Sequence, residues 1–225
     1  IINFAMNSLL PLFKKLKKEF KGEFLITKEV KQEIIDTPSE IKKFELESLQ
    51  IKELFDEKII KHADITEKEV DELRNKREEI MRIANSTFFT NKTSIHLLDK
   101  GECAALALSS IIKNENAIVV DERTTRMLCE NPENLRKLLE KKLHTKVMGL
   151  KKNYEYFSKI KIIRSSELCY IAFKKDIIGI KDSQQLIDAL LYAAKFKGCA
   201  ISQREIEEIK RWKKYSMQIE TKKEQ

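Results

Sequence analysis

Acidic residues stand at three points of the chain where carboxylates could act together. Glu33 lies in a short predicted helix, Glu102 opens a segment with almost no charge, and Asp121 follows a short apolar run. Asp99 and Glu122 each add a second carboxylate nearby. Carboxylates that converge from separate segments repel one another unless a hard cation such as Mg²⁺ or Mn²⁺ bridges them. Two such ions can hold a phosphodiester and activate the water that hydrolyses it.

The chain around two of these acids indicates how they are positioned. Cys103–Ile112 contains no charged residue, which is typical of a helix buried on all sides. The N-terminus of that helix would help to keep Glu102 ionised. Ala117–Val120 predicts a strand covered on both faces in a parallel sheet. Because open α/β sheets bind ligands beyond the carboxyl ends of their strands, we expect Asp121 and Glu122 to face a ligand.

The amino-terminal part of the chain alternates between strands and helices. Ile1–Leu10 is interpreted as the end of a strand that passes into a helix, residues 23–27 as a strand, and Lys28–Asp36 as a helix. Glu33 borders the apolar stripe of this last helix, so a place on the surface and a place in a site are both open to it.

Capping boxes mark three further helix starts. They begin at Thr37, Thr66 and Ser202. The alternation of strands and helices stops near Gly149, after which the pattern is mainly helical. We therefore predict one domain over residues 1–148 and a helical extension over residues 149–225.

The charge balance points to an anionic partner. Lysine and arginine number 44 against 36 acidic residues, which leaves a net charge of +8. A basic protein of this kind is typical of nucleic-acid binding. The last predicted helix contains Lys210, Arg211, Lys213 and Lys214. These side chains either contact RNA phosphates or lie along a helix that packs on the protein body.

Several classes of protein and site are disfavoured. The four cysteines form no CxxC pair and have no histidine at ligand spacing, so they are predicted to be buried thiols in a reducing compartment. No apolar run approaches the 18 residues of a membrane span, and no signal peptide is recognisable. A cytoplasmic protein that does not enter the membrane is the resulting expectation.

Two motifs resemble those of the PIN-domain family. LDKGECAALALSSIIKNENAIVVDERTTR, residues 98–126, is similar to the branch in which a Gly-Glu pair opens the buried helix. ITKEVKQEI, residues 26–34, is similar to the family's second motif, a strand followed by a helix that carries a glutamate. The resemblance covers about residues 1–143. It implies a three-layer α/β/α fold with a small central parallel sheet, followed here by a helical extension.

The resemblance also implies an activity and a site. Family members commonly act as metal-dependent RNA endonucleases, so the chain is expected to cut RNA with Mg²⁺ or Mn²⁺. The implied catalytic and metal-binding acids are Glu33, Glu102 and Asp121, with Asp99 and Glu122 as further metal ligands and Arg126 as a basic residue near the nucleic acid.

The family's first motif, a strand that ends in aspartate, is represented only by its tail at Ile1–Ala5, so the aspartate is expected a few residues before Ile1. If the natural chain lacks it, the alternative is an inactive PIN-like RNA-binding or scaffold module. The toxin of a toxin–antitoxin pair is a third reading, although those members are typically shorter. A homodimer is compatible with each of these readings.

Overall fold

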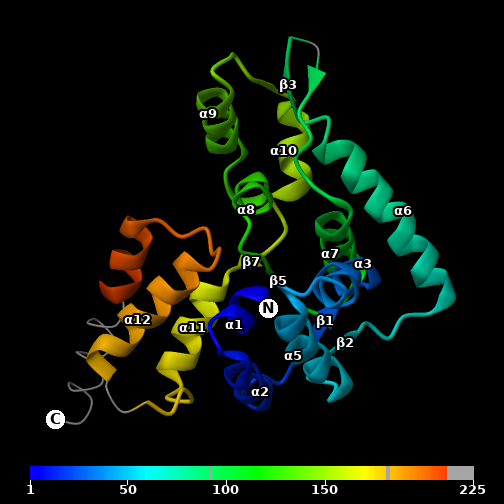
Figure 1. Cartoon of the computed structure of the whole chain (residues 1–225). Helices are drawn as coiled ribbons and strands as arrows, with labels where there is room; N and C mark the ends of the chain where they lie inside the picture. The colour runs from blue at the N-terminus through cyan, green and yellow to red at the C-terminus, as the bar shows by residue number, and fades with distance from the viewer. Residues whose placement is uncertain (92, 181–182, 212–225) are drawn as a thin grey trace.

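The structure is a computed structural model that describes residues 1–91, 93–180 and 183–211 (Figure 1). Its helices are α1 (Ile2–Met6), α2 (Leu10–Glu19), α3 (Lys28–Lys31), α4 (Thr37–Ser39), α5 (Glu45–Asp56), α6 (Glu67–Ala84), α7 (Lys100–Ile111), α8 (Arg123–Glu130), α9 (Pro132–Leu143), α10 (Lys151–Phe157), α11 (Ser165–Lys174) and α12 (Ser183–Phe196). Its strands are β1 (Phe24–Ile26), β2 (Ile60–His62), β3 (Phe88–Thr90), β4 (Thr93–Ser94), β5 (Ile118–Val119), β6 (Met148–Gly149) and β7 (Ile162–Ile163). Residues 203–211 are also helical. The predicted mixed α/β class is confirmed.

The strands of the described part form three small sheets. β1 pairs with β2 and β5 pairs with β7, both in parallel, and β3 pairs antiparallel with β4 and β6. Parallel pairing was expected, whereas the expected single central sheet is divided into two pairs in the described residues. The expectation that the strand at 117–120 is covered on both faces is wrong, because Val119 is 38% exposed.

The segment from Lys28 to Ser39 differs from its predicted form. α3 runs directly into a π-helical turn, Gln32–Asp36, and then into α4. The predicted capping box at Thr37 is therefore wrong: Thr37 has helical dihedral angles, φ −66° and ψ −46°, where a cap needs an extended backbone. The capping box at Thr66 is confirmed, since its hydroxyl accepts a hydrogen bond from the Glu69 amide and Glu69 accepts one from the Thr66 amide.

Three hydrophobic clusters hold these elements together. The first joins α1, α2 and α5 to α11 and α12, and its buried members include Phe4, Leu16, Cys169 and Leu190. The second surrounds α7. The third joins α12 to residues 199–209. Residues beyond the predicted boundary at 149 thus complete a core begun by the first twenty residues, and β7 supplies the partner of β5.

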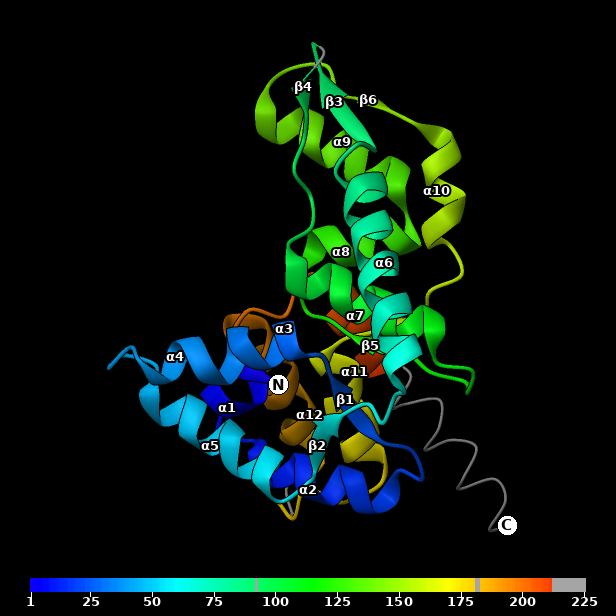
Figure 2. The same cartoon turned by 90° about the vertical axis from the view of Figure 1, so that its right-hand side faces the viewer.

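α7 is the most enclosed helix of the site region. Gly101, Cys103, Ala104, Leu106, Ala107 and Leu108 are all buried along it. It packs along α6 and also contacts α3 and β5. Figure 2 shows β3, β4, β6, α9 and α10 at the end of the molecule away from α1, α2 and α5, with α7 between these two parts. The uncharged segment was therefore correctly predicted to be a buried helix.

The cysteines also follow the prediction. Cys103, Cys129, Cys169 and Cys199 are all buried and free. Burial raises the pKa of each thiol to about 12, so these side chains stay protonated and act as small apolar groups. No helix in the described ranges is long and apolar enough to cross a membrane.

Replacement of Leu190 tests whether the two predicted parts fold as one unit. Leu190→Ala should lower the free energy of unfolding by about 2–5 kcal/mol, because Leu190 is buried in the first cluster. Urea denaturation should show one transition that shifts as a whole. Leu46→Ala is the matched control, because Leu46 is 66% exposed and its loss should change stability by about 0.5 kcal/mol or less. Two separate transitions, only one of them shifted, would contradict the single unit.

Candidate functional site

Glu33 meets the N-terminus of α7. It lies in the π-helical turn that follows α3, and such turns are frequent at functional sites. The backbone amide of Gly101 lies close enough to the Glu33 carboxylate to lower its pKa. A β-carbon at position 101 would overlap the Glu33 carboxylate, so this approach requires glycine. The Gly-Glu pair therefore serves two purposes: the glycine admits one carboxylate and the next residue supplies another.

Glu102 is held on both sides. One carboxylate oxygen accepts a hydrogen bond from the Asp99 amide at 2.9 Å, and the other accepts one from the Thr125 hydroxyl. Thr125 is buried at the start of α8, where its own amide donates to Glu122 at 2.7 Å. Glu102 therefore ties the first turn of α7 to the first turn of α8.

The electrostatics of these carboxylates favour protonation or a cation. Burial raises the pKa of Glu33, and the negative charge of Asp99 raises it further, against the lowering effect of the Gly101 amide. Burial likewise raises the pKa of Glu102, which hydrogen bonds from Thr125 and Asp99 lower and the charges of Glu122 and Asp99 raise. Asp99 thus acts on both glutamates while its own side chain is 81% exposed and bonded to His96.

The carboxylate of Asp121 contacts α11. It accepts hydrogen bonds from the amide of Ser165, at 2.8 Å, and from the Ser165 hydroxyl, at the first turn of α11. The backbone carbonyl of Asp121 accepts a hydrogen bond from Ala200. Asp121, a predicted catalytic acid, is therefore engaged with α11, whereas its neighbour Glu122 lies with Glu102.

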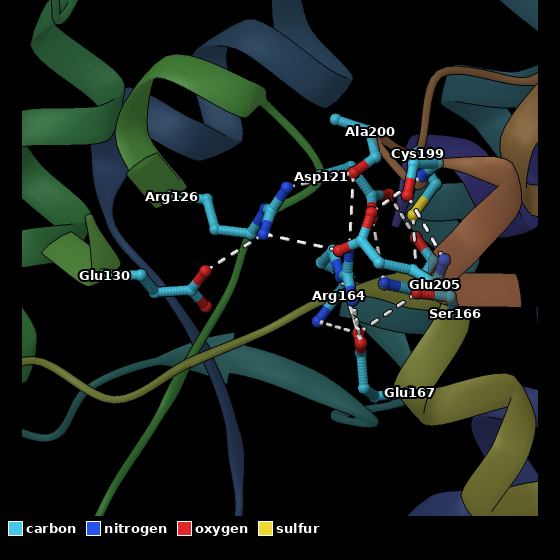
Figure 3. Close-up of polar contacts among 11 residues, drawn as sticks. Asp121, Arg126, Glu130, Arg164, Ser166, Glu167, Cys199, Ala200 and Glu205 are labelled. Atoms are coloured by element: carbon cyan, nitrogen blue, oxygen red, sulfur yellow. Dashed lines mark hydrogen bonds and ion pairs between the residues drawn. The ribbon is translucent and has the colours of Figure 1, made fainter. Parts of the chain in front are cut away.

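Arg126 belongs to an internal ion-pair network (Figure 3). Its guanidinium lies 2.9 Å from Glu130 and 3.6 Å from Glu205, and it donates to the Ala200 carbonyl. Arg164 shares Glu205, at 2.7 Å, and the same carbonyl. The network joins α8 and α11 to residues 200–205, so Arg126 serves here as a link between elements.

The effect of this network is clearest in the pKa of Glu205. Burial raises the pKa of Glu205, but hydrogen bonds from Ser202 and the positive charge of Arg164 lower it to about 2. The predicted capping box at Ser202 is confirmed, with the Ser202 amide donating to Glu205 and the Glu205 amide donating to the Ser202 hydroxyl. Glu205 thereby caps the helix at 203–211 and fastens it to the body.

The structure describes two of the four basic residues predicted for the last helix, Lys210 and Arg211. Lys210 lies 2.7 Å from Asp188, so it fastens this helix to α12. Arg211 is exposed. Lys213 and Lys214 lie outside the described residues. The contact between Lys210 and α12 supports the packing alternative for that lysine, and RNA contact by the other three stays a prediction.

Several positioning residues were not predicted. Asn85 accepts hydrogen bonds from the amides of Leu97 and Leu98, at 2.6 and 3.0 Å, and donates to the Leu98 carbonyl. It thereby fixes the loop that leads into Asp99. Because Asn85 follows a long charged helix, the sequence indicates only a helix end at this position. The position of Thr125 could have been noticed in the sequence, because it stands three residues after Glu122 at a predicted helix start, which is the spacing of a cap.

The side chains fit a hard divalent cation in donor type. Carboxylate oxygens are what Mg²⁺ and Mn²⁺ prefer. Partial burial is the main cause of the raised pKa of Glu33 and of Glu102, and the charges of neighbouring acids add to it. Within the part of the chain that the structure describes, no three histidine, cysteine or acidic side chains are grouped closely enough to hold one ion. The acids are instead arranged in neighbouring pairs, with Asp99 near Glu33 and Glu102, and Glu122 near Glu102.

No protein-family model, curated protein or solved structure matches this chain.

The variant Gly101→Ala tests the contact between Glu33 and α7. The added methyl group should displace the Glu33 carboxylate into solvent, so that the pKa of Glu33 falls towards that of an exposed glutamate. Alanine should not weaken the helix itself, since it favours helix by about 0.5–1 kcal/mol over glycine. The measurement is a ¹³C NMR titration of the glutamate side chains. Glu102 is the internal control, and its pKa should stay raised. An unchanged pKa of Glu33 would contradict the contact.

Proposed function

We propose that this protein is a metal-dependent endoribonuclease of PIN type. The observation that carries the proposal is the pair of glutamates that meet at the N-terminus of α7, Glu33 exposed and Glu102 half-buried. Glu33 and Glu102 come from separate segments and meet the same helix turn, and the pKa of each is raised. Glutamates whose pKa is raised beside further acids are typical of a functional site. RNA as substrate, Mg²⁺ or Mn²⁺ as cofactor and a cytoplasmic location are parts of this proposal.

The arrangement of the strands supports the three-layer PIN fold as part of the same proposal. β1 with β2 and β5 with β7 are both parallel, and α7 contacts β5. Ile1 lies within electrostatic reach of Asp121. An aspartate that preceded Ile1, as the family resemblance implies, would approach the acids at the end of β5.

The roles of individual residues follow from their contacts. Asp99 with Glu33, and Glu122 with Glu102, would each offer a pair of carboxylates to a metal ion, since no three acids of the described residues are grouped closely enough to hold one together. A bound Mg²⁺ or Mn²⁺ would supply charge neutralisation and Lewis acidity toward a phosphodiester. Gly101 positions Glu33 through its amide, and Thr125 and the Asp99 amide orient Glu102. Asn85 fixes the loop before Asp99 and so acts as a positioning residue.

A second candidate function is an inactive PIN-like module that binds RNA or serves as a scaffold. The observation that favours it is that two predicted site residues, Asp121 and Arg126, are bonded to groups outside the first turn of α7. Asp121 is bonded to Ser165, and Arg126 is bonded to Glu130 and Ala200. A homodimer is compatible with both functions.

The substitution Glu102→Gln tests the enzyme directly. Cleavage of labelled single-stranded RNA in Mn²⁺ or Mg²⁺ should fall by a factor of about 100 or more, because a metal-binding carboxylate becomes neutral. Glu69→Gln is the matched control. Glu69 occupies the same third position of a helix and likewise accepts hydrogen bonds from a backbone amide and a threonine hydroxyl, but it lies on α6. Its activity should equal that of the unaltered protein.

The assay should use the chain with its natural residues before Ile1, and EDTA should abolish cleavage. Undiminished cleavage by Glu102→Gln would show that the site is elsewhere. Salt-sensitive RNA binding without any cleavage would favour the inactive module.

A further inference from the structure

A pocket opens at the end of α7 opposite to the carboxylates. Its volume is about 430 Å³, within the range of small-molecule sites. Four segments line it: α6, the end of α7 with the loop that follows, α10, and the loop before β7. That loop and the one after α7 enter β7 and β5, so the pocket lies at the amino ends of these strands, whereas Asp121 and Glu122 follow the carboxyl end of β5.

Lysines dominate the charge of this pocket. Its lining includes Lys76, Lys113, Lys159 and Lys161, against a single acid, Glu115. Lys161 is paired with Glu115 at 2.5 Å, and Lys76 is paired at 3.0 Å with Glu79 beside the pocket. Lys113 and Lys159 form no ion pair with any residue that the structure describes. Glu69 lies within electrostatic range of Lys113, so four lysines stand against three acids, and the pocket keeps an excess of positive charge.

The loop that carries Lys113 is held in a defined shape. Asn116 donates from its side-chain amide to the carbonyls of Ser109 and Asn114, at 3.1 and 3.0 Å. Its side-chain oxygen accepts a hydrogen bond from the Ser109 hydroxyl at 2.5 Å. These bonds join the loop to the last turn of α7, so the pocket wall is formed before a ligand arrives.

One side of the pocket offers an apolar surface with a hydroxyl. Ile80 and Ile160 are part of the lining, and the Lys76 ammonium lies 5.0 Å from the centre of the Tyr156 ring. The Tyr156 hydroxyl is buried beside the Lys76 ammonium and the Glu79 carboxylate, which both act on its pKa. A ligand with oxygen acceptors and a flat or apolar part would use both features.

We propose that this pocket binds a phosphate-bearing ligand, with the phosphate group held by Lys113 and Lys159 and by the hydroxyl of Tyr156. Lysine ammonium groups are compact donors to phosphate oxygens, and such charge-assisted hydrogen bonds are stronger than neutral ones. The phosphate belongs either to a free nucleotide or to the backbone of a nucleic acid, since both present the same group.

This site is separate from the proposed catalytic acids. Glu102 and Ser110 stand eight residues apart on α7, and a rise of 1.5 Å per residue places them about 12 Å apart along the helix axis. The proposal therefore does not depend on the nuclease function, and the two can fail independently.

The experiment measures binding of three probes by isothermal titration calorimetry: inorganic phosphate, adenosine monophosphate and a short single-stranded RNA. The double variant Lys113→Ala/Lys159→Ala should bind adenosine monophosphate at least tenfold more weakly than the unaltered chain. Each lost charge-assisted bond contributes about 1.5–3 kcal/mol, and 1.4 kcal/mol corresponds to a factor of ten. The side-chain amide resonance of Asn116 should shift when the ligand binds. Thermal melting confirms that the variant is folded.

A matched control removes the same charge at another place. Lys15→Ala/Lys18→Ala changes two exposed lysines of α2 and should leave binding of adenosine monophosphate unchanged. If RNA displaces the nucleotide, the natural source of the phosphate is a nucleic-acid backbone; if RNA does not compete, the source is a free nucleotide. Absence of binding by all three probes, or equal binding by the lysine variant, would overturn the proposal.

Discussion

The close approach of Glu33 to the N-terminus of α7 is the constraint on which the site depends. It requires a residue without a β-carbon at position 101, and it requires α3 and α7 to touch. The π-helical turn at Gln32–Asp36 contains Glu33, and the amide of Gly101 lowers the pKa that partial burial of this carboxylate raises. Around this contact the chain gathers further acids, and the charge of Asp99 raises the pKa of both Glu33 and Glu102.

α7 separates two regions of opposite charge. Its N-terminal turn carries Asp99 and Glu102, and its C-terminal end leads into the pocket lined by lysines. The body of the helix between them is buried in the second cluster, so its position is set by packing. Both proposed sites thus depend on one rigid, enclosed element, which is how functional side chains are best held in place.

Much of this arrangement could be predicted from the sequence because it follows from local chemistry. A segment without charge predicted the buried helix α7, and the Thr66 and Ser202 capping boxes marked real helix starts. The direction of Asp121 could not be predicted, because it depends on Ser165, which is 44 residues away in the chain. The ion pairs of Arg126 with Glu205 and of Lys210 with Asp188 are also long-range contacts. Thr37 is helical although its sequence fits a capping box, because the same residue pattern also occurs where no helix begins.

Paramagnetic NMR with Mn²⁺ tests most directly whether the acids at the start of α7 hold a divalent cation. Mn²⁺ broadens the resonances of nuclei close to it, so a substoichiometric titration locates the ion without any need for catalysis. The account predicts saturable broadening of the amides of Gly101, Glu102 and Thr125, and much weaker broadening in Glu102→Gln. Broadening centred on another acidic group of the chain, or none that saturates, would contradict the central claim.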